Sequence, residues 1–218
     1  MSQLIFKFPF KTTYFEKDFF VSTNNFEAYK LIESWPKWSS NLINIFGPSG
    51  CGKTHLVNIL SKKLKLLSIN SKKFDEQINS LVEKFDCIVI ENYNENINEK
   101  LLYSLINQVK QYNKILVINS TKSLKNFQID LADLKSRLNS FLEIRIDLPT
   151  DDLIRVIISK TFSDKQIDLS SRNLEFIIKN IERSYDKIFQ FIKDIDNISL
   201  STGKSININL IKKVLINE

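Results

Sequence analysis

The residues most able to do chemistry lie in a glycine-rich loop that follows a short apolar run. The run, residues 42–46, is typical of a buried strand and leads into Gly-x-x-x-x-Gly-Lys-Thr. Three of the four glycines in the chain lie here, and glycine lets a backbone point several N–H groups at one anion. The spacing predicts a P-loop that binds a nucleotide, with an ordinary strand-to-helix turn as the alternative. The predicted nucleotide-binding residues of this stretch are Gly47, Pro48, Ser49, Gly50, Cys51, Gly52, Lys53, Thr54 and His55.

A second apolar run, residues 88–90, ends in Glu91 and Asn92. P-loop proteins place an acidic residue at a strand end to hold Mg²⁺ together with the P-loop hydroxyl of Thr54, and many add a carboxylate base beside it. We favour Glu91 at the metal position and Asn92 in the place of the base. Because an amide cannot accept a proton from water, this register predicts nucleotide binding with weak intrinsic hydrolysis. Two alternatives remain: Glu91 is itself the base, or it merely ends a strand.

Polar and basic residues further along could complete such a site. Asn119 and Ser120 follow an apolar run and could orient a water molecule or the γ-phosphate, although polar residues also begin ordinary loops. Arg137 and Arg183 stand in a chain where arginine is scarce. A guanidinium suits bidentate phosphate contact, but either arginine could equally be a surface ion-pair partner.

Apolar strands alternate with helical patterns as far as Pro149. Alternation of this kind predicts a parallel sheet with helices on both faces. An earlier helix is predicted to start at Phe26 and to end at Pro36, with Phe26, Tyr29, Leu31 and Ile32 near one face. The predicted strands are 42–46, 66–69, 87–92, 114–119 and 141–148, and the predicted helices between them are 55–60, 74–84, 97–112 and 131–138.

After Pro149 the alternation of apolar strands and helices ends. Helical spacing recurs at 151–162, 171–181, 185–200 and 207–216, which predicts a small all-helical domain. The predicted organisation is an N-terminal tail of residues 1–12, an α/β nucleotide-binding domain of residues 13–149 and a helical domain of residues 150–218.

Composition narrows the class of protein. A chain of 218 residues with 43% hydrophobic content can bury a full core. No apolar stretch approaches the roughly 20 residues of a membrane span, and lysine interrupts the N-terminal stretch too early for a secretory signal. Two cysteines fit a reducing cytoplasm better than a disulfide framework. The net charge of +6 favours polyanions such as DNA, but the lysines are spread widely, so we interpret them as solvated surface.

In their order along the chain, these motifs resemble those of the AAA+ ATPases of the replication-initiator group. The resemblance covers nearly the whole chain and implies an AAA+ P-loop fold with sheet order 5-1-4-3-2 and a helical lid that closes over the adenine of ADP or ATP. The motifs that carry it are Phe19-Phe20-Val21, Trp35-Pro36-x-Trp38, the loop 47–54, Ile90-Glu91-Asn92, Leu131-x-Asp133-Leu134-x-Ser136-Arg137-Leu138 and Arg183.

The resemblance also implies roles for single residues. It makes Arg137 an arginine finger that acts in trans on a partner's nucleotide, Asn119 or Ser120 the first sensor, and Arg183 the second sensor. Thr54 and Glu91 would hold Mg²⁺, although the family usually has Asp at the position of Glu91. The residues that would pack against the base are Phe20 and Val21.

One subgroup of this family lacks a DNA-binding domain and carries Asn at the position of Asn92. Its members bind the DNA polymerase sliding clamp through an N-terminal motif, which Gln3, Leu4, Phe6 and Phe8 resemble; a first strand packed on the core is the alternative. By this resemblance the partners are DnaA, the clamp and, through the clamp, DNA, while self-association is left open. The expected function is negative regulation of replication initiation by stimulating ATP hydrolysis in DnaA. The alternative is an autonomous motor or loader ATPase that acts on DNA or a helicase.

Overall fold

The computed structural model describes residues 19–202 and 206–216, so the predicted clamp-binding tail lies outside the described residues. The chain divides after Asp147 into an α/β unit and a helical unit, and each is described by itself. The α/β unit contains α1 (Phe26–Glu33), β1 (Leu42–Phe46), α2 (Lys53–Leu60), β2 (Leu66–Asn70), η2 (Ser71–Lys73), η3 (Glu76–Lys84), β3 (Cys87–Tyr93), α3 (Glu99–Gln111), β4 (Ile115–Ser120), η4 (Leu124–Asn126), α4 (Ala132–Asn139) and β5 (Leu142–Arg145).

The five strands form one parallel sheet in the order β2-β3-β4-β1-β5. Read from its other edge this is the predicted order, and the predicted five-stranded parallel sheet is confirmed. Strand β1 lies between β4 and β5, where Ile43 is in register with Val117 and Leu142. In a parallel sheet all carboxyl ends meet at one edge, so the loops that follow β1, β3 and β4 come together there.

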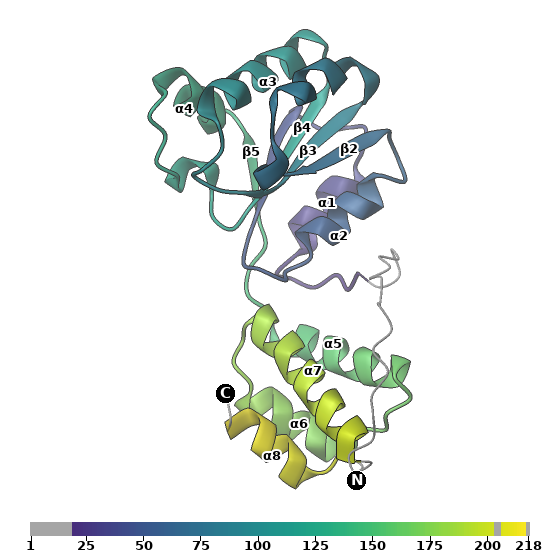
Figure 1. Ribbon diagram of the computed structural model, residues 1–218. Helices are drawn as coiled ribbons and strands as arrows, with labels where there is room; N and C mark the ends of the chain where they lie inside the picture. Colours follow the sequence, from purple (N-terminus) through teal and green to yellow (C-terminus); the bar gives the residue numbers. More distant parts are fainter. Residues whose placement is uncertain (1–18, 203–205, 217–218) are drawn as a thin grey trace. The chain divides into compact units, whose positions relative to one another are not determined.

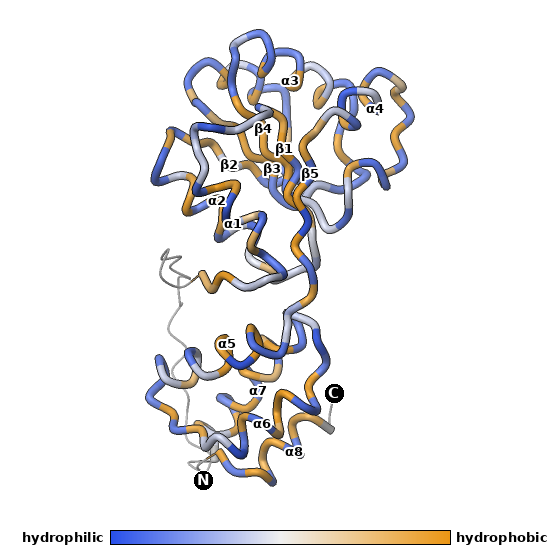
Figure 2. The backbone as a smooth tube through the Cα atoms, turned by 180° about the vertical axis from the view of Figure 1, so that it is seen from behind, coloured by the Kyte–Doolittle hydropathy of each residue, from blue (hydrophilic) through white to orange (hydrophobic). Residues whose placement is uncertain are grey.

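The core of this unit lies on both faces of the sheet. Strands β1, β3 and β4 are buried almost throughout, and Figure 2 shows hydrophobic residues concentrated on these central strands. In Figure 1, α1 and α2 cover one face, while α3 and α4 cover the other. On the second face the buried residues include Leu42, Ile88, Ile90, Leu116 and Ile118 from the strands and Leu102, Leu105, Ile106, Val109, Leu134 and Leu138 from the helices.

Three predicted elements differ from the observed ones. The segment predicted as a helix over 74–84 is a 3-10 helix, η3, which starts only at Glu76 because the Asp75 carboxylate accepts the Gln77 N–H. The fifth strand is shorter than predicted and covers only Leu142–Arg145. Helix α1 ends at Glu33, before Pro36, and it buries Ala28 and Ile32 while Phe26 is 47% exposed. Of the residues predicted to lie near one face of this helix, Ile32 is therefore buried and Phe26 is exposed.

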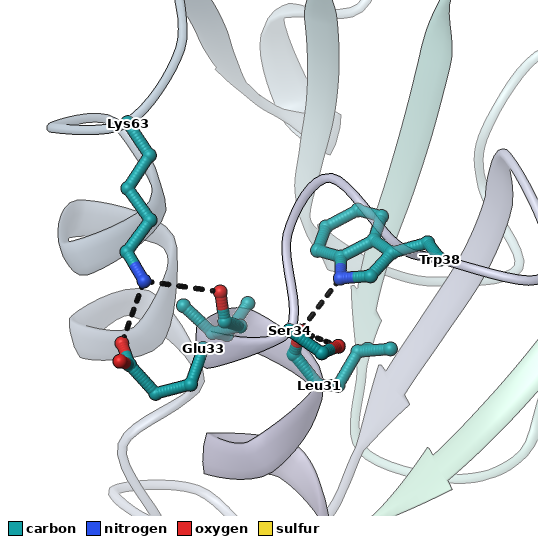
Figure 3. Close-up of polar contacts among 6 residues, drawn as sticks. Leu31, Glu33, Ser34, Trp38 and Lys63 are labelled. Atoms are coloured by element: carbon teal, nitrogen blue, oxygen red, sulfur yellow. Dashed lines mark hydrogen bonds and ion pairs between the residues drawn. The ribbon is translucent and has the colours of Figure 1, made fainter.

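Side-chain hydrogen bonds fix the C-terminal end of α1, and Figure 3 shows them in close-up. The carbonyl of Leu31 accepts the Trp38 indole N–H at 2.6 Å and the Ser34 hydroxyl at 2.8 Å. The Lys63 ammonium, just beyond α2, binds the Glu33 carboxylate at 2.7 Å and the Ile32 carbonyl at 3.4 Å. These contacts satisfy terminal carbonyls of α1 and attach it to the helix that follows the P-loop.

The helical unit consists of α5 (Asp151–Asp164), α6 (Ser171–Asn180), α7 (Tyr185–Thr202) and α8 (Ile208–Ile216). Thr150 and Ser170 cap α5 and α6 by accepting the N–H groups of Leu153 and Asn173. Its own core is formed by buried residues that include Ile154, Ile158, Phe162, Ile177, Ile188, Phe191, Ile195 and Ile211. Within residues 19–202 and 206–216, no helix combines the length and apolar character that crossing a membrane requires.

Candidate nucleotide-binding site

The loop between β1 and α2 has the backbone conformation that its glycines make accessible. Gly50 and Gly52 have φ values of 75° and 98°, in the left-handed region that side chains disfavour. Gly52 immediately precedes Lys53, the first residue of α2, so the loop ends at a helix N-terminus, where free N–H groups favour an anion. The local geometry is therefore that of a phosphate-binding loop.

Gly47 is required for a different reason, the close approach of another backbone. A Cβ atom built on Gly47 would lie 2.5 Å from the carbonyl oxygen of Ile146, which follows β5. The Gly47 N–H donates to the Ser120 carbonyl at 3.2 Å, and the Ile146 N–H donates to the Phe46 carbonyl at 2.8 Å. Gly47 thus lies where the ends of β1, β4 and β5 converge.

Replacement of Gly47 by alanine is expected to lower the free energy of unfolding by about 2 kcal/mol, because the new methyl group must displace the backbone at Ile146. Urea denaturation monitored by circular dichroism measures this loss. Ser49→Ala is the matched control in the same loop, since Ser49 is exposed, and its stability should stay within about 0.5 kcal/mol of the parent. Equal stability of the two variants would contradict the close approach at Gly47.

The Lys53 side chain folds back over this loop. Its ammonium donates to the carbonyl oxygens of Gly47 and Pro48, each at 2.8 Å, and lies 3.6 Å from the Cys51 sulfur. Burial raises the pKa of the Cys51 thiol despite the nearby ammonium, so this thiol stays protonated. Lys53 therefore supplies a positive charge at the loop, the position from which a P-loop lysine reaches phosphates.

Three predicted site residues from three different elements meet behind the loop. The hydroxyl of Thr54 (α2) lies 3.2 Å from Glu91 Oε2 (β3), and the Asn119 amide (β4) donates to the same oxygen at 3.0 Å. Glu91 is 8% exposed and Asn119 is fully buried. Among the described residues, Glu91 Oε1 and Asn119 Oδ1 are buried without a hydrogen-bond partner. Two unpaired buried oxygens beside a hydroxyl form a polar arrangement that suits a cation or a hydrogen-bond donor.

These residues fit a Mg²⁺ ion chemically. Carboxylate, amide and hydroxyl oxygens are the hard ligands that Mg²⁺ prefers, and Mg²⁺ commonly takes only one or two carboxylates with the rest from water and phosphate. The described part of the chain has no group of three His, Cys, Asp or Glu residues that could hold a metal by itself. Any Mg²⁺ held by Thr54 and Glu91 would therefore depend on phosphate oxygens of a nucleotide.

Asn92, predicted to take the place of a catalytic base, lies at a break in β3. Its φ is +56°, and the pairing of β3 with β4 shifts register between Ile90 and Tyr93. The Ser71 hydroxyl donates to the Asn92 carbonyl at 2.7 Å and so holds this bulge. Asn92 is exposed, and asparagine tolerates the left-handed conformation better than most residues. The residue after Glu91 thus has a backbone role that the sequence pattern did not reveal.

The sequence left Asn119 and Ser120 as alternatives for the first sensor. In the structure the two side chains have different hydrogen-bond partners. Asn119 contacts Glu91, whereas the Ser120 hydroxyl accepts from the Asn44 amide at 2.9 Å and donates to the Lys122 carbonyl at 2.7 Å. Asn44 is fully buried in β1 and also donates to the Ile118 carbonyl at 2.8 Å. Asn119 is therefore beside the predicted metal ligand, and Ser120 belongs to a network that fixes the end of β4.

Sequence reasoning missed Asn44, and it named Phe19 only within the Phe19-Phe20-Val21 motif without giving it a role. The Phe19 ring lies 2.9 Å from a Cβ built on Gly52 and packs edge-on against His55 with ring centroids 5.3 Å apart. Phe19 also stacks on Tyr29 of α1, which joins the segment before α1 to the loop. A polar residue within an apolar strand was the available signal for Asn44. For Phe19 the signal was only its place beside Phe20.

The segment predicted to contact the base lies next to this aromatic contact. The buried Asn25 side chain holds it, donating to the Phe20 carbonyl and accepting the Ser22 N–H, both at 2.8 Å. Val21 is 44% exposed, so an apolar side chain is available there for contact. The positions of Phe20 and Val21 relative to a base remain a prediction.

Arg137 lies in the last turn of α4, on the side of the sheet covered by α3 and α4. Within the described residues it forms no ion pair, whereas Arg145, Arg155 and Arg183 each pair with a carboxylate. Its neighbour is another cation: partial burial and, secondly, the positive charge of Arg137 lower the pKa of Lys110 on α3. A half-buried guanidinium beside a second cation is suited to receive an anion from outside the chain.

Arg183 lies in the helical unit, in the connection before α7. Its guanidinium forms a two-point pair with Asp151 in the first turn of α5, with Nε–Oδ1 and Nη2–Oδ2 distances of 2.9 and 3.2 Å. That edge-on pairing uses only part of the guanidinium, which has five N–H donors. Its predicted contact with a nucleotide stays a prediction.

The chain is similar in sequence to known proteins over most of its length. No protein-family model matches it. An uncharacterized protein of Haemophilus influenzae is 25% identical over 203 aligned residues, which cover 85% of this chain and 87% of that protein. The replication initiator DnaA of Buchnera aphidicola subsp. Baizongia pistaciae is 27% identical over 243 aligned residues, which cover 99% of this chain and 53% of that protein. The chain thus spans about half the length of this DnaA relative.

Solved structures agree in fold. Domain III of Thermotoga maritima DnaA matches with a TM-score of 0.79 at 20% identity, covering 96% of this chain and 98% of that domain. AMPPCP-bound DnaA from Aquifex aeolicus matches with a TM-score of 0.70 at 16% identity, covering 84% of this chain and 64% of that chain. In sequence the chain is therefore similar to the replication initiator DnaA, and in fold it is similar to domain III of Thermotoga maritima DnaA.

Proposed function

We propose that this chain binds ADP or ATP at the loop 47–54. The observation that carries this proposal is the convergence of Thr54 and Asn119 on one carboxylate oxygen of the buried Glu91 behind the loop. On nucleotide binding, Lys53 would exchange its contacts with the Gly47 and Pro48 carbonyls for phosphate oxygens. Mg²⁺ held at Thr54 and Glu91 would neutralise phosphate charge.

We infer that the chain acts as a DnaA-related regulator of the Hda type, which promotes ATP hydrolysis in DnaA and so limits replication initiation in the cytoplasm. Its relation to DnaA supports this role. Asn92 supports it as well, because a site without a carboxylate base after Glu91 is poorly equipped to activate water on its own. The chain would then hold a nucleotide to keep its shape while hydrolysis takes place in the partner's site.

Arg137 is the residue that would act on the partner. An arginine supplied in trans stabilises the charge that develops on the transferred phosphoryl group. The absence of any ion pair to Arg137 within the described residues, and the presence of Lys110 beside it, support an external anion as its ligand. The nucleotide in DnaA would provide that anion.

An autonomous motor or loader is the competing function, and steady-state ATP hydrolysis separates the two. A regulator should turn over ATP far more slowly than about 1 s⁻¹, the lower end of ordinary enzyme rates. The measurement is made without DnaA, with and without DNA, and with Lys53→Ala as the blank for contaminating ATPases. Fast turnover that Lys53→Ala abolishes would contradict the regulator and favour the motor.

The N-terminal tail is proposed to bind the sliding clamp through Gln3, Leu4, Phe6 and Phe8. An extended segment with one amide and large apolar anchors suits a small hydrophobic pocket. Deletion of residues 1–8 is expected to abolish co-migration with the clamp in gel filtration and to leave nucleotide affinity unchanged. Gln3→Ala with Leu4→Ala, and a scrambled 1–8 sequence of equal composition, are the finer variants. Co-migration of the deleted protein at the parental level would refute this motif.

A further inference from the structure

Glu99, the first residue of α3, makes contacts that reach another helix. Its Oε1 accepts the Asp130 N–H at 3.0 Å, and its Oε2 accepts the Leu131 N–H at 2.7 Å. Both amides lie directly ahead of α4, which starts at Ala132. A carboxylate that takes two successive backbone N–H groups forms charge-assisted hydrogen bonds, which are stronger than neutral ones.

Helix α4 has no cap of its own. Leu131 is its N-cap residue, and no side-chain hydrogen bond is made there, although the first N–H groups of a helix need acceptors. Glu99 supplies an acceptor from a neighbouring helix instead, and its negative charge suits a helix N-terminus. With eight residues, α4 is too short to be stable by itself, so its position depends on such contacts and on burial of Leu134 and Leu138.

The same carboxylate lies near the end of β3. Burial, and then the negative charges of Glu99 and Glu95, raise the pKa of the Tyr93 hydroxyl. Tyr93 follows Glu91 by two residues and packs edge-on against Phe127, with ring centroids 4.8 Å apart. Phe127 belongs to the stretch that leads into α4. The approach to α4 therefore contacts the strand that carries the predicted metal ligand, through Phe127 and Tyr93, and the start of α3, through Glu99.

We propose that Glu99 is a positioning residue for Arg137. By fixing the start of α4 against α3 and β3, it sets where the last turn of that helix presents the Arg137 guanidinium. This inference rests on the proposed role of Arg137 in trans. It adds a residue that contacts neither the nucleotide nor the partner's phosphates and that acts only through the placement of α4.

The test compares Glu99→Ala with the parent by amide hydrogen exchange and by stimulation of DnaA-bound ATP hydrolysis. Removal of both acceptors should speed exchange of the Asp130 and Leu131 amides and of the first turn of α4 about tenfold. Stimulation should fall about tenfold or more, because small misplacement of a catalytic group has large rate effects. Nucleotide affinity should stay within about twofold, since no ligand of the proposed site is changed.

Two further variants make the result specific. Glu99→Gln keeps one carbonyl acceptor and should fall between the parent and Glu99→Ala in both exchange and stimulation. Glu95→Ala is the matched control, because Glu95 lies in the connection just before α3 but pairs with Lys122 at the surface. It removes a carboxylate near Tyr93 without freeing an amide of α4, so both readouts should stay at the parental level.

The possible outcomes are distinct. Parental exchange at Asp130 and Leu131 in Glu99→Ala, or parental stimulation, would overturn the inference. A loss of nucleotide affinity equal to the loss of stimulation would also overturn it, because it would indicate a general structural role. If the parent itself fails to stimulate DnaA, the proposed function is wrong, and amide exchange alone then decides whether Glu99 holds α4.

Discussion

Replacement of Arg137 by alanine is expected to reduce stimulation of DnaA-bound ATP hydrolysis by about a thousandfold, the lower range for an arginine finger. The physical reason is loss of a positive charge that stabilises the transition state in the partner's site. The fold should not suffer, because Arg137 is only half-buried and forms no ion pair within the described residues. Single-turnover hydrolysis by pre-loaded DnaA measures the effect.

Two further variants test whether the effect is specific to the guanidinium group and to the position of Arg137. Arg137→Lys keeps the charge but loses the planar fork, so it should restore only a minor part of the activity. Arg172→Ala, an exposed arginine of α6, removes the same kind of side chain elsewhere and should behave like the parent. Parental stimulation by Arg137→Ala would exclude the arginine from the reaction, whatever the other residues do.

Replacement of Lys53 by alanine is expected to weaken ADP and ATP binding by about a hundredfold, because charge-assisted contacts to phosphates are lost. The same ammonium now donates to the Gly47 and Pro48 carbonyls, so circular dichroism must confirm that the variant is folded. Isothermal titration with ADP, after removal of bound nucleotide, gives the dissociation constants.

Lys62→Ala is the matched control for Lys53. Lys62 is an exposed lysine just after α2, so its loss should leave the dissociation constant for ADP within about twofold. An affinity of Lys53→Ala within threefold of the parent would contradict nucleotide binding at the loop 47–54, even if the protein binds nucleotide elsewhere.

The features that the sequence predicted depend on local patterns of residue types along the chain. The apolar runs ending at Phe46 and Glu91 are buried strands because parallel sheets covered on both faces need continuous apolar segments. The positive φ values of Gly50 and Gly52 follow from the glycine spacing of the loop. The meeting of Glu91 with Asn119 was predictable too, because the carboxyl ends of parallel strands share one edge.

The features that it did not predict depend on contacts between distant segments. Asn44 is recognisable as a network residue only when Ser120 lies beside it on the neighbouring strand. Glu99 looks like an ordinary acidic residue at a helix start until the approach to α4 is placed against it. The bulge at Asn92 arises from pairing between β3 and β4 and from the Ser71 hydroxyl, so the residue types at 91 and 92 alone could not indicate it.

The measurement that tests the central claim most directly is single-turnover hydrolysis of ATP already bound to DnaA. DnaA is loaded with radiolabelled ATP, freed of excess nucleotide, and mixed with clamp-loaded DNA and this protein carrying ADP. The account predicts that conversion to ADP is at least about a thousandfold faster than in DnaA alone, and that omission of the clamp or replacement of Arg137 by alanine removes the acceleration. A conversion rate that this protein leaves unchanged, with clamp and ADP both present, would contradict the account.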